Sequence, residues 1–283
     1  MPFQVTTYNG AEILAIQAPV WVGSVRSMLR TAAREMLKDK PFHLWNDPTD
    51  LLLTYDETGE PAAVQDMTPS MKAATALTTV IGYLQDLEAD YVDIVAGIDV
   101  DFLKEKQAAT QRAAEDEFKS GKWDGTTKST YIQFLDDAAW RSYIKMNPSP
   151  GGSSPESTEG ETTPPHKAKT RDRVIRMNKA NHTVAAVVHE VFHVIEGDGT
   201  DELGMYFVEA CCEYLTCEAL GGIDLRWAKG YGKDAPAPVY QKNLRNIRKA
   251  VAQQELTKRD IHLAFFASDK TALEKVFDKV GNN

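Results

Sequence analysis

The sequence His-Glu-Val-Phe-His at positions 189–193 holds the residues best suited to chemistry in this chain. His189 and His193 are four positions apart, so on a helix their imidazoles project from one face and can bind a single metal ion. Glu190 lies on a neighbouring part of that face, close enough to accept a proton from a metal-activated water. The spacing therefore predicts a Zn²⁺ site with Glu190 as the general base.

The surrounding residues are typical of a helix anchored in a core. We expect this helix over residues 183–196, with a polar start, an apolar opposite face and Gly197 at its end. A second helix is expected over residues 201–220. A catalytic zinc ion needs a third protein ligand as well as an open position, and this second helix is the nearest source of one.

The second helix contains two acids four residues apart, in the sequence Glu-Ala-Cys-Cys-Glu at positions 209–213. Together with HExxH this pattern resembles the gluzincins, zinc peptidases whose second helix bears a glutamate ligand. The resemblance implies that Glu209 is the third ligand and that Glu213 supports a ligand histidine. Helical geometry agrees, because both positions share one face. The best-known gluzincins place their ligand glutamate later, at a spacing that falls on Glu213 here, so the two acids could exchange roles.

Two other zincin patterns fit less well. The metzincins require a glycine and then a third histidine where this chain has Glu196 and Gly199. The aspzincins use a Gly-Thr turn followed closely by an aspartate ligand, which leaves Asp201 and Glu202 as outside candidates. The gluzincin pattern is therefore preferred.

Zinc peptidases commonly stabilise the oxyanion of the tetrahedral intermediate with a side-chain donor. Tyr231 is our first candidate, because glycines flank it in a loop from which a side chain can reach a cleft. Arg226, Tyr240 and His262 stay open as alternatives.

The three cysteines, Cys211, Cys212 and Cys217, are an odd, clustered set and make a poor disulfide framework. We expect them to be small buried residues. A thiolate of Cys212 or Cys217 bound to the metal would instead indicate a non-catalytic module with a structural metal, since structural zinc sites have four protein ligands.

The remaining pattern predicts an α+β fold, with a zincin-like catalytic core that is mostly helical and carries a small mixed sheet. An N-terminal scaffold region over 1–125 is expected to pack on a catalytic region over 126–283. Strand-like runs at 142–147 and 173–178 suggest neighbouring strands joined by a mobile loop, rich in Pro, Ser and Gly, at 148–165. The other expected elements are strands at 3–8, 12–17, 51–55 and 61–65, and helices at 24–38, 69–88, 101–119, 239–253, from 257 and at 269–280.

Charge and hydropathy limit the classes of partner that this chain is expected to bind. The net charge of -9 argues against a nucleic-acid binder with a broad basic surface. No stretch is long and apolar enough to predict membrane insertion. The N-terminus shows no signal-peptide pattern, so we expect cytoplasmic synthesis and, if the protein is exported, a non-classical secretion system. An acidic chain with no signal-peptide pattern and a short zincin-like core resembles bacterial effector or toxin metallopeptidases. This resemblance implies a protein or peptide substrate.

Overall fold

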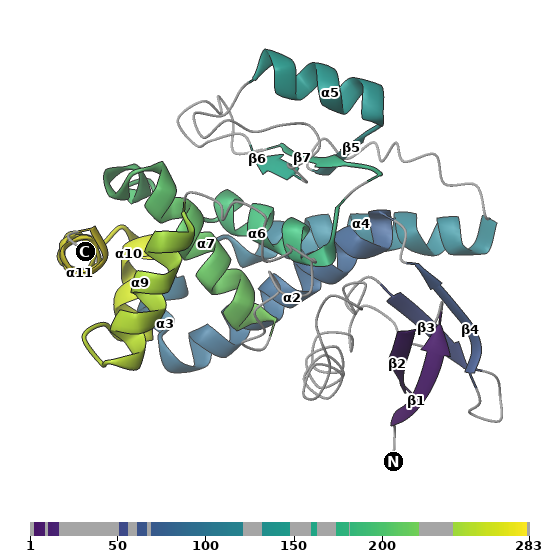
Figure 1. The fold of residues 1–283 in the computed structure, drawn as a ribbon, viewed down its shortest axis with the longest axis horizontal. Coiled ribbons are helices and arrows are strands. Elements are labelled where there is room, and N and C mark those ends of the chain that lie inside the picture. The colour runs from purple at the N-terminus through teal and green to yellow at the C-terminus, as the bar shows by residue number, and fades with distance from the viewer. Residues whose placement is uncertain are drawn as a thin grey trace.

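The computed structural model describes residues 3–8, 11–16, 51–55, 61–66, 69–120, 132–147, 160–162, 174–180, 182–220 and 240–281. Near the N-terminus, β1 (Phe3–Tyr8) pairs with β2 (Ala11–Ile16), and β3 (Leu51–Tyr55) pairs with β4 (Pro61–Asp66). Both are antiparallel hairpins, and Figure 1 shows them to one side of a helical body. All four predicted strands are confirmed. The helix expected over 24–38 lies outside the described residues.

A three-stranded mixed sheet lies over the centre of the helical body. Its strands are β5 (Ile132–Leu135), β6 (Gly160–Thr162) and β7 (Ile175–Asn178), in the order β5-β7-β6. β7 is parallel to β5 and antiparallel to β6. Helix α5 (Asp137–Met146) covers one face of the sheet, and α6 (Val184–Val194) lies against the other (Figure 1). A mostly helical chain with a small mixed sheet confirms the α+β class.

The neighbours of β7 differ from those predicted. Residues 142–147, expected as a strand, form the end of α5. The Asp136 carboxylate accepts a hydrogen bond from the Ala139 backbone N–H at the start of this helix, and Trp140 and Ile144, four positions apart, are buried. Residues 160–162, predicted to belong to a mobile loop, form β6 instead. The other residues of the predicted loop lie outside the described residues.

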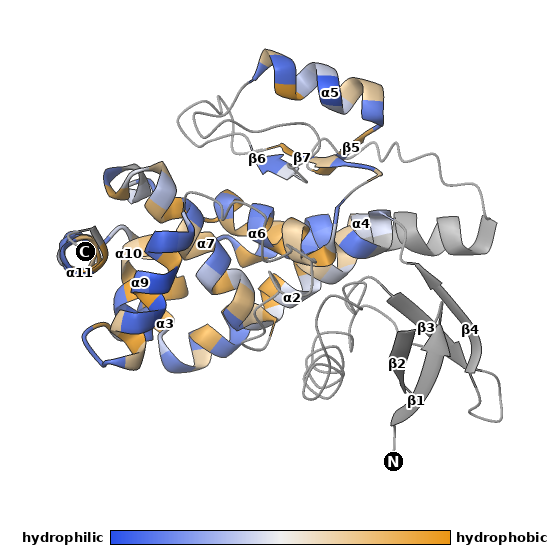
Figure 2. Ribbon diagram, viewed as in Figure 1, coloured by the Kyte–Doolittle hydropathy of each residue, from blue (hydrophilic) through white to orange (hydrophobic). Residues whose placement is uncertain are grey.

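Helices enclose α6 on its other sides. α2 (Pro69–Asp90) packs against it, and α4 (Val100–Ser120) packs on α2. α7 (Met205–Ala219) returns beside α6 after the short η4 (Thr200–Leu203). The remaining helices are α3 (Val92–Val95), α9 (Gln241–Ala252), α10 (Lys258–Ala267) and α11 (Lys270–Gly281). In Figure 2 α5 and α9 are banded blue and orange, as expected of helices with one face in solvent.

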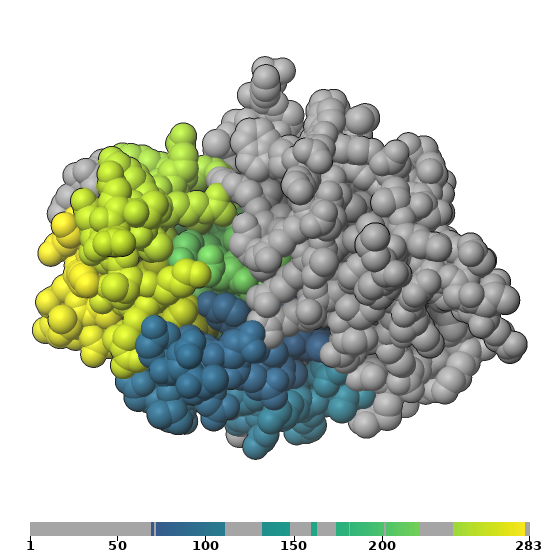
Figure 3. All heavy atoms as spheres, turned by 90° about the horizontal axis from the view of Figure 1, so that it is seen from below, coloured from purple at the N-terminus to yellow at the C-terminus, as the bar shows by residue number. Residues whose placement is uncertain are grey.

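One hydrophobic cluster joins these helices to the sheet. It contains residues of α2, α3 and α4 as well as residues of β5, β7 and the later helices. Helices from the predicted scaffold region, 1–125, therefore share a core with the predicted catalytic region, 126–283. The division into these two regions itself stays a prediction. Seen from below, a small green patch is visible between the blue and yellow atoms (Figure 3).

Helix α6 owes its stability to burial more than to its composition. Thr183 caps it by accepting a hydrogen bond from the Ala186 backbone N–H. Its many β-branched valines have modest helix propensity. Nine of its eleven residues are buried, however, and each buried valine contributes about 1.5–3 kcal/mol. Tertiary packing thus fixes the helix that carries the HExxH sequence.

Within the described part of the chain, no helix combines the length and the apolar character needed to cross a membrane.

Phe192 should be a sensitive test of this packing. Its ring is fully buried in α6 and meets Tyr83 of α2 edge to face, with centroids 5.8 Å apart. Phe192→Ala should lower the free energy of unfolding by about 3–5 kcal/mol, because it leaves a cavity. The matched variant Phe277→Ala, at a ring that is 44% exposed, should cost about 1–1.5 kcal/mol. Urea unfolding followed by circular dichroism measures both, and equal losses would contradict the packing described for α6.

Candidate metal centre

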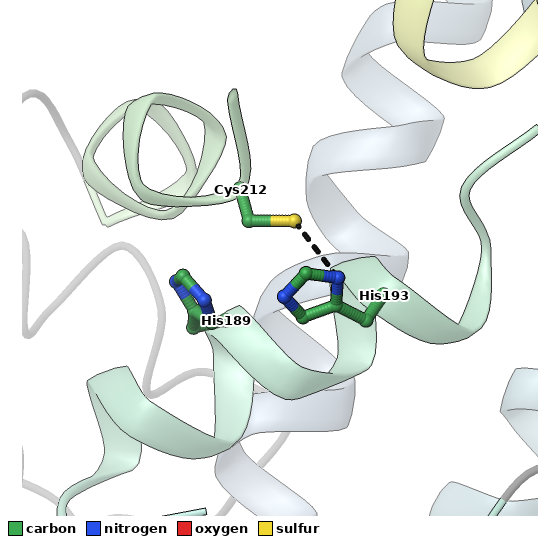
Figure 4. A group of neighbouring side chains, drawn as sticks. All are labelled: His189, His193 and Cys212. Atoms are coloured by element: carbon green, nitrogen blue, oxygen red, sulfur yellow. Dashed lines mark hydrogen bonds between the residues drawn. The ribbon is translucent and has the colours of Figure 1, made fainter. Parts of the chain in front are cut away.

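His189 and His193 are the two residues of α6 that are not buried. Both rings project toward α7, as Figure 4 shows, and their centroids are 5.0 Å apart. The other residues of the helix are packed against the sheet, α2 and α7. The fold therefore turns the histidine pair toward the second helix, as the spacing predicted.

Glu209 of α7 faces both histidines. Its Oε2 lies 3.1 Å from His189 Nε2, and its Oε1 lies 3.5 Å from His193 Nε2. Nitrogen and oxygen ligands of one tetrahedral zinc ion are about 3.4 Å apart, given the usual bond lengths. The three side chains thus have the donor types and separations that suit one ion. The Glu209 side chain is 33% exposed, so this side of the site is open to solvent.

The remaining ring nitrogens face two further acids. His189 Nδ1 is buried and lies 3.5 Å from Glu213 Oε2, within ion-pair range but long for a hydrogen bond. His193 Nδ1 lies 3.3 Å from Oε2 of Glu196, which is buried just beyond the end of α6. Each imidazole therefore has its own carboxylate on the side away from Glu209. Such partners fix the tautomer and orientation of a ligand histidine.

Cys212 offers a second way to complete the donor set. Its Sγ lies 3.4 Å from His193 Nδ1 (Figure 4), and His189, His193 and Cys212 have possible ligand atoms within 4.8 Å of one another. This contact uses the nitrogen opposite to the one that faces Glu209. Burial raises the pKa of the Cys212 thiol, which disfavours the thiolate that binds metals. We therefore prefer Glu209 as the third donor. All three cysteines are buried thiols, as predicted.

The acids shift the protonation of the histidines. Burial lowers the pKa of His189, but hydrogen bonding with Glu209 and Glu213 outweighs it and raises the pKa to about 9. Burial also lowers the pKa of His193, yet its neighbours Cys212, Glu209 and Glu196 hold that pKa well above its usual range. The neighbouring groups therefore favour the protonated form of both metal-free imidazoles. A divalent cation that bound here would displace the protons.

Glu190 is a buried residue of α6, and its side chain points toward β6. Its Oε2 accepts a hydrogen bond of 2.8 Å from the Thr162 hydroxyl. Burial raises the pKa of Glu190, although the two histidines lower it in part. A carboxyl group with a raised pKa, next to a histidine pair, is suited to exchanging protons near neutral pH.

The structure does not identify which residue would stabilise the oxyanion. Tyr231 and Arg226 lie outside the described residues. His262 is buried, with its Nε2 2.8 Å from the Tyr83 hydroxyl, and burial lowers its pKa to about 4. Tyr240 is partly buried at the start of α9. The assignment of the oxyanion donor therefore stays a prediction.

Sequence reasoning missed two residues that the fold brings to the site. Glu196 had no role in the predicted gluzincin site, but it is buried beside His193. Its position three residues after His193 was the available signal. Thr162 carried no signal, because it lies in a segment whose composition favours disorder. Glu202, an outside candidate for a ligand, is exposed on η4.

Comparison with protein-family models, with curated proteins and with solved structures found no match. The function of the site must therefore be inferred from its own geometry.

Proposed function

We propose that this protein is a zinc-dependent metallopeptidase of the gluzincin type, which hydrolyses peptide bonds. His189, His193 and Glu209 would hold the ion, and Glu213 would support His189. The observation that carries the proposal is that both Nε2 atoms converge on the Glu209 carboxylate at separations suited to one tetrahedral ion. A zinc ion held there would acidify a water molecule and polarise the scissile carbonyl.

Glu190 supplies the proton transfers in this mechanism. It is the residue next to His189 in α6, so its carboxyl group is carried by the same turn as the ligand pair. Its raised pKa lets it accept the water proton and then donate it to the leaving amine. In this mechanism Glu209 binds the metal, and Glu190 accepts and donates the protons.

The position of β6 supports a peptide as the substrate. In the described sheet β6 is an edge strand that pairs with β7, and its Thr162 touches Glu190. An extended peptide can add to such an edge through main-chain hydrogen bonds. A strand laid there would bring its backbone close to the general base. We further propose that this sheet, α6 and α7 form a zincin-like core. We also propose that the protein is delivered into other cells as an effector.

A non-catalytic metal site is the second candidate function. The observation in its favour is the contact between Cys212 and His193. A site closed by Cys212 in addition to Glu209 would leave no position for water, as in structural zinc sites. The one-third exposure of Glu209 favours the open, catalytic site instead.

Substitutions at three residues should separate the two ligand sets. Glu209→Gln should weaken zinc binding by more than about 100-fold, because it removes a ligand. Glu213→Gln should weaken it by about 10–100-fold, because the residue supports a ligand histidine. Cys212→Ala should change it by less than about threefold if the thiol is not a ligand. Competition with a chromogenic zinc chelator measures these affinities.

Glu202→Gln is a matched control, since it makes the same chemical change at an exposed acid and should leave zinc affinity unaltered. Strong loss of zinc in Cys212→Ala, with retention in Glu209→Gln, would replace the proposed ligand set by the cysteine-containing one.

Glu190→Gln should separate metal binding from catalysis. The variant should keep zinc within about threefold of the wild-type affinity and lose about 10²–10⁴-fold in kcat, because it removes the general base. The assay is a proteome-derived peptide library incubated with the zinc-loaded protein, with new termini identified by mass spectrometry. Wild-type cleavage rates in Glu190→Gln would rule out the proposed mechanism. A zinc-loaded wild type that cleaves no peptide would favour the structural site.

A further inference from the structure

Thr162 makes two contacts with one residue, Glu190. Its Oγ1 lies 2.8 Å from Glu190 Oε2 and 3.0 Å from the Glu190 backbone oxygen. Thr162 is itself buried. The single hydroxyl proton can serve only one acceptor at a time. The shorter contact, to an oxygen that can carry charge, is the stronger one, so the hydroxyl donates to the Glu190 carboxyl group.

Strand β6 is anchored so that this contact is fixed. Gly160 and Thr162 pair with Met177 and Ile175 of β7. Between them Glu161 points to the opposite face, as alternation in a strand requires, and accepts a hydrogen bond of 3.0 Å from the Tyr143 hydroxyl of α5. The strand is therefore tied to α5 on one face and to α6 on the other.

Gly160 lets β6 approach Glu190 closely. A Cβ atom at this position would lie 2.9 Å from Glu190 Cγ and 2.6 Å from the sulfur of Met177, whose side chain is fully buried. A Cβ atom is essentially never found this close to another heavy atom, so any larger residue would displace the strand, the Met177 side chain or the glutamate. Gly160 and Thr162 lie on the same face of β6, and together they confine Glu190 from Cγ to the carboxyl oxygen.

We propose that Thr162 is a positioning residue that sets the orientation of the Glu190 carboxyl group, with Gly160 providing the space for it. The catalytic consequence rests on the proposed peptidase function. A general base works only when it is held within hydrogen-bond reach of the proton it accepts, and a displacement of about 1 Å can cost about 100-fold in rate. In this proposal Thr162 acts through Glu190, by its contact with Oε2.

Thr162→Val tests the proposal, because valine keeps the shape of threonine and lacks its hydroxyl. We expect kcat on a peptide cleaved by the wild type to fall by about 10–100-fold, with KM and zinc affinity unchanged. Thr162→Ser should restore kcat to within about threefold of the wild type, since it returns the hydroxyl donor. Crystal structures of the zinc-free Thr162→Val variant should show the Glu190 carboxyl group in a different rotamer.

Thr79→Val is the matched control. Thr79 is also buried, and its hydroxyl donates to a helix carbonyl, the Thr75 oxygen, at 2.9 Å. Loss of that hydroxyl should leave kcat unaltered. Gly160→Ala is a second variant, and it should lower kcat in the same way by displacing β6 or Glu190.

The outcomes separate this inference from the proposed function. If the wild type cleaves peptides and Thr162→Val retains its kcat with Glu190 unmoved, the positioning role is wrong. If the wild type cleaves no peptide, the peptidase proposal fails, and the position of Glu190 in the variant crystal structure still decides whether Thr162 orients it.

Discussion

The two imidazoles at the edge of the core lie among several carboxylates, and the centre of this molecule is built around the contacts between them. Helix α6 buries every residue except His189 and His193. The neighbouring helix, α7, supplies Glu209 and Glu213, and the segment after α6 supplies Glu196. A buried charge without a partner costs several kcal/mol, so the packing of α6 against α7 depends on these contacts as well as on the apolar core.

The balance of charge at the centre favours a cation. Besides Glu190, three carboxylates lie beside the two histidines. Protons on the imidazoles offset part of that charge in the metal-free protein, which is why the pKa of His189 rises despite its burial. A divalent ion could replace those protons without leaving any of the acids unpaired. The same residues thereby stabilise the fold and form a site ready for a metal.

The sheet contributes to this centre through its shortest strand. β6 has three residues and gains its order from β7, from Tyr143 of α5 and from Glu190 of α6. Its contacts come from three separate elements, so its position depends on all three. Glu190 and the edge of the sheet are consequently placed by one set of contacts.

The sequence by itself determined the local features. Helical spacing was sufficient to place His189, His193, Glu209 and Glu213 on facing turns of two helices, and hairpin and helix signals located most of the described elements, because these depend on nearby residues. Only the tertiary structure decided which acid faces which ring nitrogen, and that Glu196 and Thr162 belong to the site. It also decided that 142–147 is helical and 160–162 a strand, since long-range packing and strand pairing, which spacing does not encode, outweigh local preference there.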